Sequence, residues 1–167
     1  MKILIVSDTH RQNGNYFKVV EQQKPDLVIH CGDVEGCEDI LTESAGCPVR
    51  IVPGNNDFFS GLPRELLLDI GCYKVWVTHG HNYYVSMGNE TLKREAVARG
   101  VDIVFYGHTH RPVIDREENR IIAVNPGSLS YPRQEGRRPS YALMELDQKG
   151  EARFRFMGLP PLVFRGK

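Results

Sequence analysis

The chain has 167 residues, of which 41% are hydrophobic and 25% are charged, a composition typical of one globular domain spanning residues 1–167. Its 21 basic and 21 acidic residues give a formal net charge of zero, which argues against a general nucleic-acid binder because such proteins need excess positive charge. No apolar run approaches the roughly 18 residues that a membrane span needs.

The start of the chain and its cysteines favour a cytoplasmic protein. Residues 1–10 contain one lysine and only a short apolar run before Ser7 and Asp8, so we expect a buried strand there and not a signal peptide. No two of the four cysteines form a Cys-x-x-Cys pair; they are Cys31, Cys37, Cys47 and Cys72. We expect these thiols to be reduced and to hold no structural zinc ion.

The first half of the chain alternates strand and helix patterns. Continuous apolar runs predict buried strands at residues 3–6, 27–29 and 49–52. Between them, apolar residues at helical spacing predict one helix over residues 16–23 and another over residues 37–45. This order of strands and helices favours a parallel sheet with right-handed crossovers.

The second half of the chain is dominated by strands. Its patterns predict a helix over residues 92–97 and strands at residues 66–70, 73–78, 103–106, 113–115, 121–124, 141–146 and 153–157. Short turns between the late strands favour antiparallel pairing. We therefore expect an α/β fold in which two mixed sheets pack face to face with helices outside. We place Trp76, Phe154 and Phe156 in its core, and expect the tail from Leu159 onward to run irregularly over the surface.

Polar side chains gather where the predicted strands end. Along the chain these strand-end residues are Asp8, His10, Asp33, Asn55, Asn56, Asp57, His79, His108 and His110. Because loops beyond the carboxyl ends of strands in α/β sheets converge on one crevice, we expect five separate loops to bring these donors together. Most of them have a glycine neighbour, which permits the tight turns that aim a side chain inward.

The residue types in this cluster indicate divalent metal ions. Carboxylates, imidazoles and an amide oxygen suit Mn²⁺, Fe²⁺, Ni²⁺ or Zn²⁺. Two carboxylates, four imidazoles and one amide are too many for one ion, so the pattern predicts two. Two such ions about 3.5–4 Å apart can activate a water molecule and clamp the phosphoryl oxygens of an in-line displacement.

Five short segments resemble the motifs of the calcineurin-like metallophosphoesterases, in the order in which that family has them. They are Ser7-Asp8-Thr9-His10, Gly32-Asp33, Gly54-Asn55-Asn56-Asp57, Thr78-His79-Gly80-His81 and Gly107-His108-Thr109-His110. The small size and the segment Asn125-Pro126-Gly127-Ser128 are similar to the compact YfcE-like phosphodiesterases. The resemblance covers residues 1–147 and implies a four-layer α/β/β/α sandwich.

The resemblance also implies a ligand set for two divalent ions, with Mn²⁺ expected first and Ni²⁺, Fe²⁺ or Zn²⁺ as alternatives. In that set Asp8, His10 and His110 hold the first ion, Asn55, His79 and His108 hold the second, and Asp33 bridges the two. The reaction implied is the hydrolysis of a small phosphodiester by attack of a metal-bridging hydroxide.

One position departs from the family pattern. Many relatives carry histidine directly after the motif asparagine, where it stabilises the transition state or protonates the leaving group, whereas this chain has Asn56. Asparagine can donate a hydrogen bond but cannot deliver a proton at neutral pH. We expect Asn56 near the phosphate, with His81 as a second catalytic candidate; the alternative for His81 is a solvated or supporting position. Asp57 is expected to orient the asparagine loop.

Other polar residues allow two interpretations each. Arg11 and Arg133 either bind a phosphate oxygen or are solvated surface residues. Arg133, Arg137 and Arg138 form a cluster that we expect in an exposed loop, too short to indicate a nucleic-acid surface. Ser128 either lies near the site or belongs to a plain turn.

The sequence as a whole favours a two-metal phosphoesterase that acts on a small phosphodiester or nucleotide. The first alternative is a scaffold for protein contacts, as in the retromer subunit of the same superfamily, which has asparagine in place of the motif histidine; here His10 is present. The second is a nuclease or cyclic-nucleotide phosphodiesterase, for which the zero net charge gives no support on long nucleic acids. No pattern indicates a membrane partner or an oligomer.

Overall fold

Two five-stranded sheets form the centre of the computed structural model, which describes residues 1–116 and 121–160. Sheet A has the order β10-β9-β1-β2-β3, with β1 Lys2–Val6, β2 Leu27–His30, β3 Val49–Ile51, β9 Ser140–Leu146 and β10 Ala152–Gly158. Sheet B has the order β4-β5-β6-β8-β7, with β4 Leu66–Ile70, β5 Tyr73–Val77, β6 Ile103–Phe105, β7 Pro112–Arg116 and β8 Ile122–Pro126.

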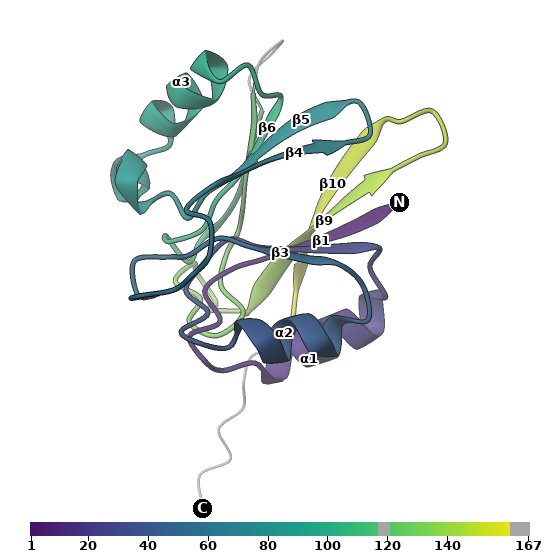
Figure 1. The fold of residues 1–167 in the computed structure, drawn as a ribbon, viewed down its shortest axis with the longest axis vertical. Helices are drawn as coiled ribbons and strands as arrows, with labels where there is room; N and C mark the ends of the chain where they lie inside the picture. The colour runs from purple at the N-terminus through teal and green to yellow at the C-terminus, as the bar shows by residue number, and fades with distance from the viewer. Residues whose placement is uncertain (117–120, 161–167) are drawn as a thin grey trace, which may run out of the picture.

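Helices cover the two outer faces of this pair of sheets. Helices α1 (Gly14–Gln23) and α2 (Glu38–Ala45) lie together on the outer side of sheet A, and α3 (Glu90–Ala98) lies on the far side of sheet B (Figure 1). Two short 3₁₀ helices, His81–Tyr83 and Val85–Met87, precede α3. The result is the predicted α/β/β/α sandwich of two mixed sheets.

Strand pairing places the carboxyl ends of six strands at one edge of the sandwich. In sheet A, β1, β2 and β3 run parallel, and in sheet B, β5, β6 and β8 run parallel. The antiparallel pairs are β1 with β9, β9 with β10, β4 with β5, and β7 with β8. The expected antiparallel pairing of the late strands is therefore confirmed for two pairs, whereas β6 pairs in parallel with β8 because β7 lies at the sheet edge.

Alternation along the strands divides the core into layers. Ile3 and Ile5 of β1 pack between the sheets, while Leu4 and Val6 face α1 and α2. On sheet B, Trp76 is fully buried on the side of α3. Because both faces of the central strands are covered, their sequences read as continuous apolar runs.

The outer strand β10 contains one wrong core prediction. Phe154 packs against the core between the sheets, as expected, but Phe156 is 38% exposed. Both side chains lie on the same face of the strand; the core between the sheets does not extend as far as Phe156. The cysteines are unpaired thiols. The predicted irregular tail lies, beyond residue 160, outside the described residues. No helix in the described ranges has the length and apolar character to cross a membrane.

Candidate metal centre

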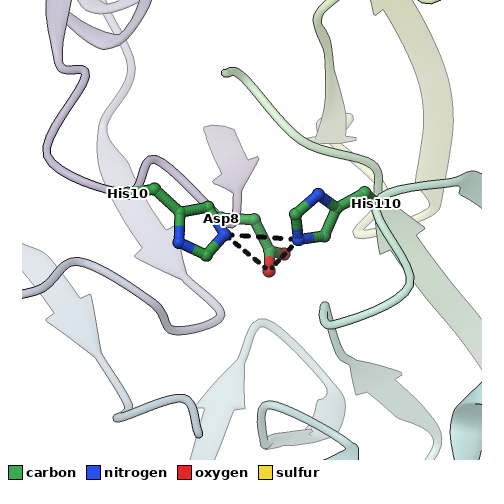
Figure 2. A group of neighbouring side chains, drawn as sticks. All are labelled: Asp8, His10 and His110. Carbon is green, nitrogen blue, oxygen red and sulfur yellow. Dashed lines mark hydrogen bonds and ion pairs between the residues drawn. The ribbon is translucent and has the colours of Figure 1, made fainter. Parts of the chain in front are cut away.

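Loops that follow strands of both sheets meet at the common edge of the sandwich. Asp8 and His10 follow β1, Asp33 follows β2 and Asn55 follows β3, while His79 follows β5 and His108 and His110 follow β6. Figure 2 shows Asp8, His10 and His110 pointing toward one another from opposite sheets. All seven residues predicted as metal ligands from the sequence thus come together.

The backbone at this edge is held in an uncommon conformation. Five of the seven candidate ligands have left-handed φ angles: Asp8 at 55°, His10 at 45°, Asp33 at 60°, His108 at 69° and His110 at 57°. Such angles are strained for residues other than glycine and concentrate at functional sites. Glycines provide the remaining space, since a Cβ at Gly54 would overlap the Asp33 carboxylate and one at Gly107 would overlap the Ser7 hydroxyl.

The first group of candidate ligands is Asp8, His10 and His110. The Nε2 atom of His110 lies 3.0 Å from Oδ1 of Asp8 and 3.3 Å from Nε2 of His10. The Nδ1 atom of His110 lies 2.7 Å from the Tyr131 carbonyl oxygen, which can only accept a hydrogen bond. Likewise, Nδ1 of His10 lies 2.7 Å from the Glu35 carboxylate. Each neutral ring therefore carries its proton on Nδ1 and turns an Nε2 lone pair toward Asp8.

The second group consists of Asn55, His79 and His108. The Nδ1 atom of His79 lies 2.7 Å from the Cys31 carbonyl oxygen, so its Nε2 atom also presents a lone pair when the ring is neutral. That Nε2 atom lies 3.5 Å from Oδ2 of Asp33 and 3.1 Å from the amide oxygen of Asn55. Nδ1 of His108 lies 2.8 Å from the same amide oxygen.

Asp33 lies between the two groups. Its Oδ2 atom is 3.7 Å from Nε2 of His10, in the first group, and 3.5 Å from Nε2 of His79, in the second. Two sets of three residues, Asp8 with His10 and His110, and Asp8 with Asp33 and His79, have ligand atoms within 4.8 Å of one another. A carboxylate in this position can contact ions in both groups.

The chemistry of these donors fits divalent cations. Oδ1 of Asp8 is buried and accepts no hydrogen bond from any described residue. Burial alone would raise the pKa of Asp8, but hydrogen bonding from His110 and the positive charge of His79 and His110, when these rings are protonated, outweigh it and lower that pKa. The same holds for Asp33, where His79 and Asn56 outweigh burial and lower the pKa. Ionised carboxylates and convergent lone pairs are satisfied by a cation.

Comparison with known proteins agrees with this geometry. Residues 1–149 match the family model of the calcineurin-like phosphoesterase superfamily domain. The chain belongs to this superfamily. Metallophosphoesterases of this kind use divalent metal ions, and the two groups described above are the candidate metal-binding residues of this chain.

Relatives of this metallophosphoesterase include proteins from bacteria and archaea. It is 33% identical over 150 residues to the probable metallophosphoesterase YsnB of Bacillus subtilis, covering 88% of this chain and 85% of YsnB. It is 31% identical over 146 residues to the phosphodiesterase MJ0936 of Methanocaldococcus jannaschii, covering 76% of this chain and 83% of MJ0936.

Solved structures share the fold. A predicted phosphoesterase from Streptococcus pneumoniae TIGR4 superposes with a TM-score of 0.76 at 30% identity, over 95% of this chain and 97% of that one. YfcE, a phosphoesterase from E. coli, gives 0.63 at 20% identity, covering 91% and 96% of the two chains. Vps29 of Entamoeba histolytica, complexed with Zn²⁺, gives 0.75 at 21% identity, covering 95% and 99%. The predicted resemblance to this superfamily is confirmed.

Asn56 and Asp57 support the carboxylate that lies between the two groups. The backbone N–H and the side-chain amide of Asn56 donate to the two oxygens of Asp33, at 2.9 and 2.8 Å. The Asp57 carboxylate accepts backbone N–H groups from four residues: Asp33, Val34, Glu35 and Gly54. As predicted, Asp57 orients the asparagine loop, and it fixes the Asp33 loop as well.

His81 completes a cluster of three imidazoles on the second group's side. Its ring centroid lies 5.4 Å from that of His79 and 6.1 Å from that of His108. Burial and the neighbouring His79 lower the pKa of His81, so its ring is neutral at pH 7. Its Nδ1 atom is buried without a hydrogen-bond partner among the described residues. The catalytic roles expected for Asn56 and His81 stay predictions.

Three supporting residues escaped the sequence analysis or were left open by it. Glu35, which orients His10, was missed, and so was His30, which is fully buried. The Nδ1 atom of His30 accepts the Gly32 N–H at 3.2 Å, and its Nε2 atom lies 3.1 Å from the Thr9 hydroxyl. The Ser128 hydroxyl donates a hydrogen bond to the backbone carbonyl of Asp8 at 2.8 Å. Of the two interpretations given for Ser128, the structure therefore favours a position near the site. The signal for His30 and Glu35 was their position beside Gly32-Asp33.

Two pockets flank the site, and the arginines divide between them. Arg11 lines a pocket of about 760 Å³ together with the asparagine loop. Arg133 and Arg137 line another, of about 1100 Å³, next to His10 and His110. Arg138, from the same predicted cluster, is exposed and does not line either pocket.

Proposed function

We propose that this chain is a metal-dependent phosphodiesterase that hydrolyses small organic phosphodiesters at a centre of two divalent ions. The observation that carries the proposal is the convergence of imidazoles and carboxylates from loops of both sheets, with Oδ1 of Asp8 buried and without a hydrogen bond from any described residue. Asp8, His10 and His110 would hold one ion, and Asn55, His79 and His108 the other. The position of Asp33, within 4 Å of both His10 and His79, supports a bridging role. Mn²⁺ is the first candidate. The same oxygen and nitrogen ligands also accept Ni²⁺, Fe²⁺ and Zn²⁺.

When bound, the two ions supply an activated water nucleophile and positive charge against the phosphoryl oxygens. The chain's own residues orient these donors. Glu35 and the Tyr131 carbonyl fix the ring planes of His10 and His110, and Asn56 fixes the Asp33 carboxylate. Pre-oriented ligands need no rearrangement when the substrate arrives.

The candidate for contact with the leaving group is His81. Because burial and His79 lower its pKa, the neutral imidazole is favoured, and in that form the ring donates a hydrogen bond. A site of this kind favours esters whose leaving group needs little protonation, such as aryl diesters. Similarity to the phosphodiesterase MJ0936 supports a diester over a monoester.

Metal-free protein should test this proposal directly. Chain purified without chelator and then stripped with EDTA should hydrolyse bis-p-nitrophenyl phosphate only after Mn²⁺, Ni²⁺ or Zn²⁺ is added. Calorimetric titration with Mn²⁺ should show two sites. Folded protein that binds no Mn²⁺ and cleaves no aryl diester with any of these ions would contradict it.

That outcome would favour the alternative of a protein-interaction scaffold. The fold shared with Vps29 keeps this alternative open. The observation against it is that all seven candidate ligand positions hold donor side chains in converging positions.

A further inference from the structure

The pocket beside His10 and His110 has a strongly basic lining. It has a volume of about 1100 Å³, and its lining includes Arg111, Arg133 and Arg137. Among the described residues, none of these three guanidinium groups donates a hydrogen bond or forms an ion pair. Unpaired arginines grouped in a concave site are suited to bidentate contact with a phosphate or a carboxylate.

Backbone contacts attach this basic pocket to the candidate metal ligands. Arg111 directly follows His110, and the N–H of Arg133 donates to the His110 carbonyl at 3.0 Å. The His110 ring in turn donates to the Tyr131 carbonyl at 2.7 Å. Arg137 has a left-handed φ of 41° in a turn that its N–H closes onto the Gln134 carbonyl at 3.0 Å. These contacts place the backbone of Arg111 and Arg133 beside His110, while the side chains of all three arginines are exposed.

The pocket on the other side of the site has the opposite charge. Its lining includes Glu35, Glu38, Asp39 and Asp57 with a single arginine, Arg11. Glu35 also reaches the basic pocket, but its carboxylate is bonded to the His10 ring. A substrate with a negatively charged arm is therefore attracted by the basic pocket on one side of the site and repelled by the acidic pocket on the other.

We propose that the substrate is a phosphodiester with a second phosphate-type anion on one of its ester arms, and that Arg111, Arg133 and Arg137 bind that anion. This proposal rests on the proposed phosphodiesterase function. Tyr131, which is 46% exposed and lines the same pocket, adds an aromatic surface for the arm that carries the anion. The three arginines are then specificity-determining residues that act on the substrate and not on the reacting phosphorus.

Two synthetic diesters with the same leaving group test the proposal. Ethyl p-nitrophenyl phosphate has an uncharged arm, and 2-phosphonoethyl p-nitrophenyl phosphate has a dianionic one. With saturating Mn²⁺, the wild-type chain should show about tenfold higher kcat/KM on the phosphonate substrate, mainly through a lower KM. Hydrolysis of both at equal kcat/KM would overturn the inference but leave the proposed function standing. Hydrolysis of neither would overturn the proposed function.

Variants locate the preference in the pocket. In Arg133→Gln and Arg137→Gln the ratio of kcat/KM between the two substrates should fall toward one. Arg138→Gln is the matched control, because Arg138 belongs to the same loop, is exposed and does not line the pocket. Its ratio should equal that of the wild type. A preference that survives in both pocket variants would overturn the inference.

A binding measurement on metal-free protein gives an answer independent of activity. In EDTA-treated chain, phenylphosphonate should shift the Nε–Hε NMR signals of Arg111, Arg133 and Arg137 and leave that of Arg138 in place. The shifts should saturate and should weaken at high salt, since the contact is electrostatic. Absence of shifts at all three arginines would overturn the anion site, whatever the chain hydrolyses.

Discussion

The two halves of the candidate metal centre differ in burial and support. In the half made by Asp8, His10 and His110, each imidazole has a hydrogen-bond partner behind it, and Asp8 is fully buried. In the other half, His79 is supported in the same way, but Asn55 is exposed on its loop. If the chain binds two ions as we propose, the first half would be the stronger, preformed position, and the second would be weaker and open to solvent and substrate.

Asp33→Asn should have the largest effect, because this residue faces both halves. Removing its charge weakens both metal positions, so we expect a loss of about 10³-fold in kcat/KM on bis-p-nitrophenyl phosphate. The measurement is steady-state kinetics with Mn²⁺, with Asp69→Asn on the exposed face of β4 as the matched control. Near-normal activity of the Asp33 variant would exclude a bridging role.

Asn55→Ala separates the two halves. The variant should keep about one Mn²⁺ per chain, because all ligands of the first half are intact. It should lose about 10²-fold in activity, because the second ion is no longer held. Metal content after gel filtration, with calorimetry, measures this. His10→Ala should instead lose the tighter of the two ions. If Asn55→Ala lost the tighter ion, our ranking of the halves would be reversed.

His30 supports both halves of the site from beneath, since it is hydrogen-bonded to the Thr9 hydroxyl and to the Gly32 N–H. Burial lowers the pKa of His30 to about 4, from an ordinary value of 6.5. Between these two pH values, His30 is protonated in the unfolded chain but neutral in the folded chain. The free energy of unfolding therefore decreases as the pH falls through this range. The contribution is about 2 kcal/mol between pH 7.5 and 5.

Urea unfolding of EDTA-treated protein at both pH values measures this contribution. His30→Asn keeps an acceptor for the Gly32 N–H but has no proton to gain, so its stability should depend less on pH than that of the wild type. Equal pH dependence in the two proteins would show that His30 is not held neutral in the fold.

The smallest effect is expected from Glu35→Ala, which removes the partner of His10 and leaves every candidate ligand in place. Metal affinity of the first half should weaken about tenfold. Glu38→Ala is the control, because Glu38 lines the same acidic pocket without contacting His10. Competition against a fluorescent Mn²⁺ chelator measures the Mn²⁺ affinity of both variants. Equal affinities would show that Glu35 does not support metal binding.

Most of the fold and all seven converging donors could be predicted from the sequence, because both depend on local patterns. Buried strands such as β1 and β2 show as apolar runs, and strand ends in α/β sheets converge on one edge. The parallel pairing of β6 with β8 and the exposure of Phe156 depend on neighbours distant in sequence. No local pattern carries that information.

The supporting residues escaped for the same reason. The partner of Glu35 is His10, 25 residues away, and that of His30 is Thr9, 21 residues away. The arginine pocket combines Arg111 with a loop that begins some twenty positions later. Such contacts exist only once the loops are folded together, whereas the candidate ligands are marked in the sequence by their own strand ends.

The left-handed backbone at Asp8, His10, Asp33, His108 and His110 also constrains how this site can evolve. Branched or bulky replacements there would burden the fold itself, whether or not the chain still catalyses a reaction. Apart from glycine, asparagine and aspartate tolerate this conformation best. In a descendant that no longer hydrolyses a substrate, substitutions to asparagine or glycine would therefore be accepted first at these positions. The loops of such a protein would keep the conformation seen here.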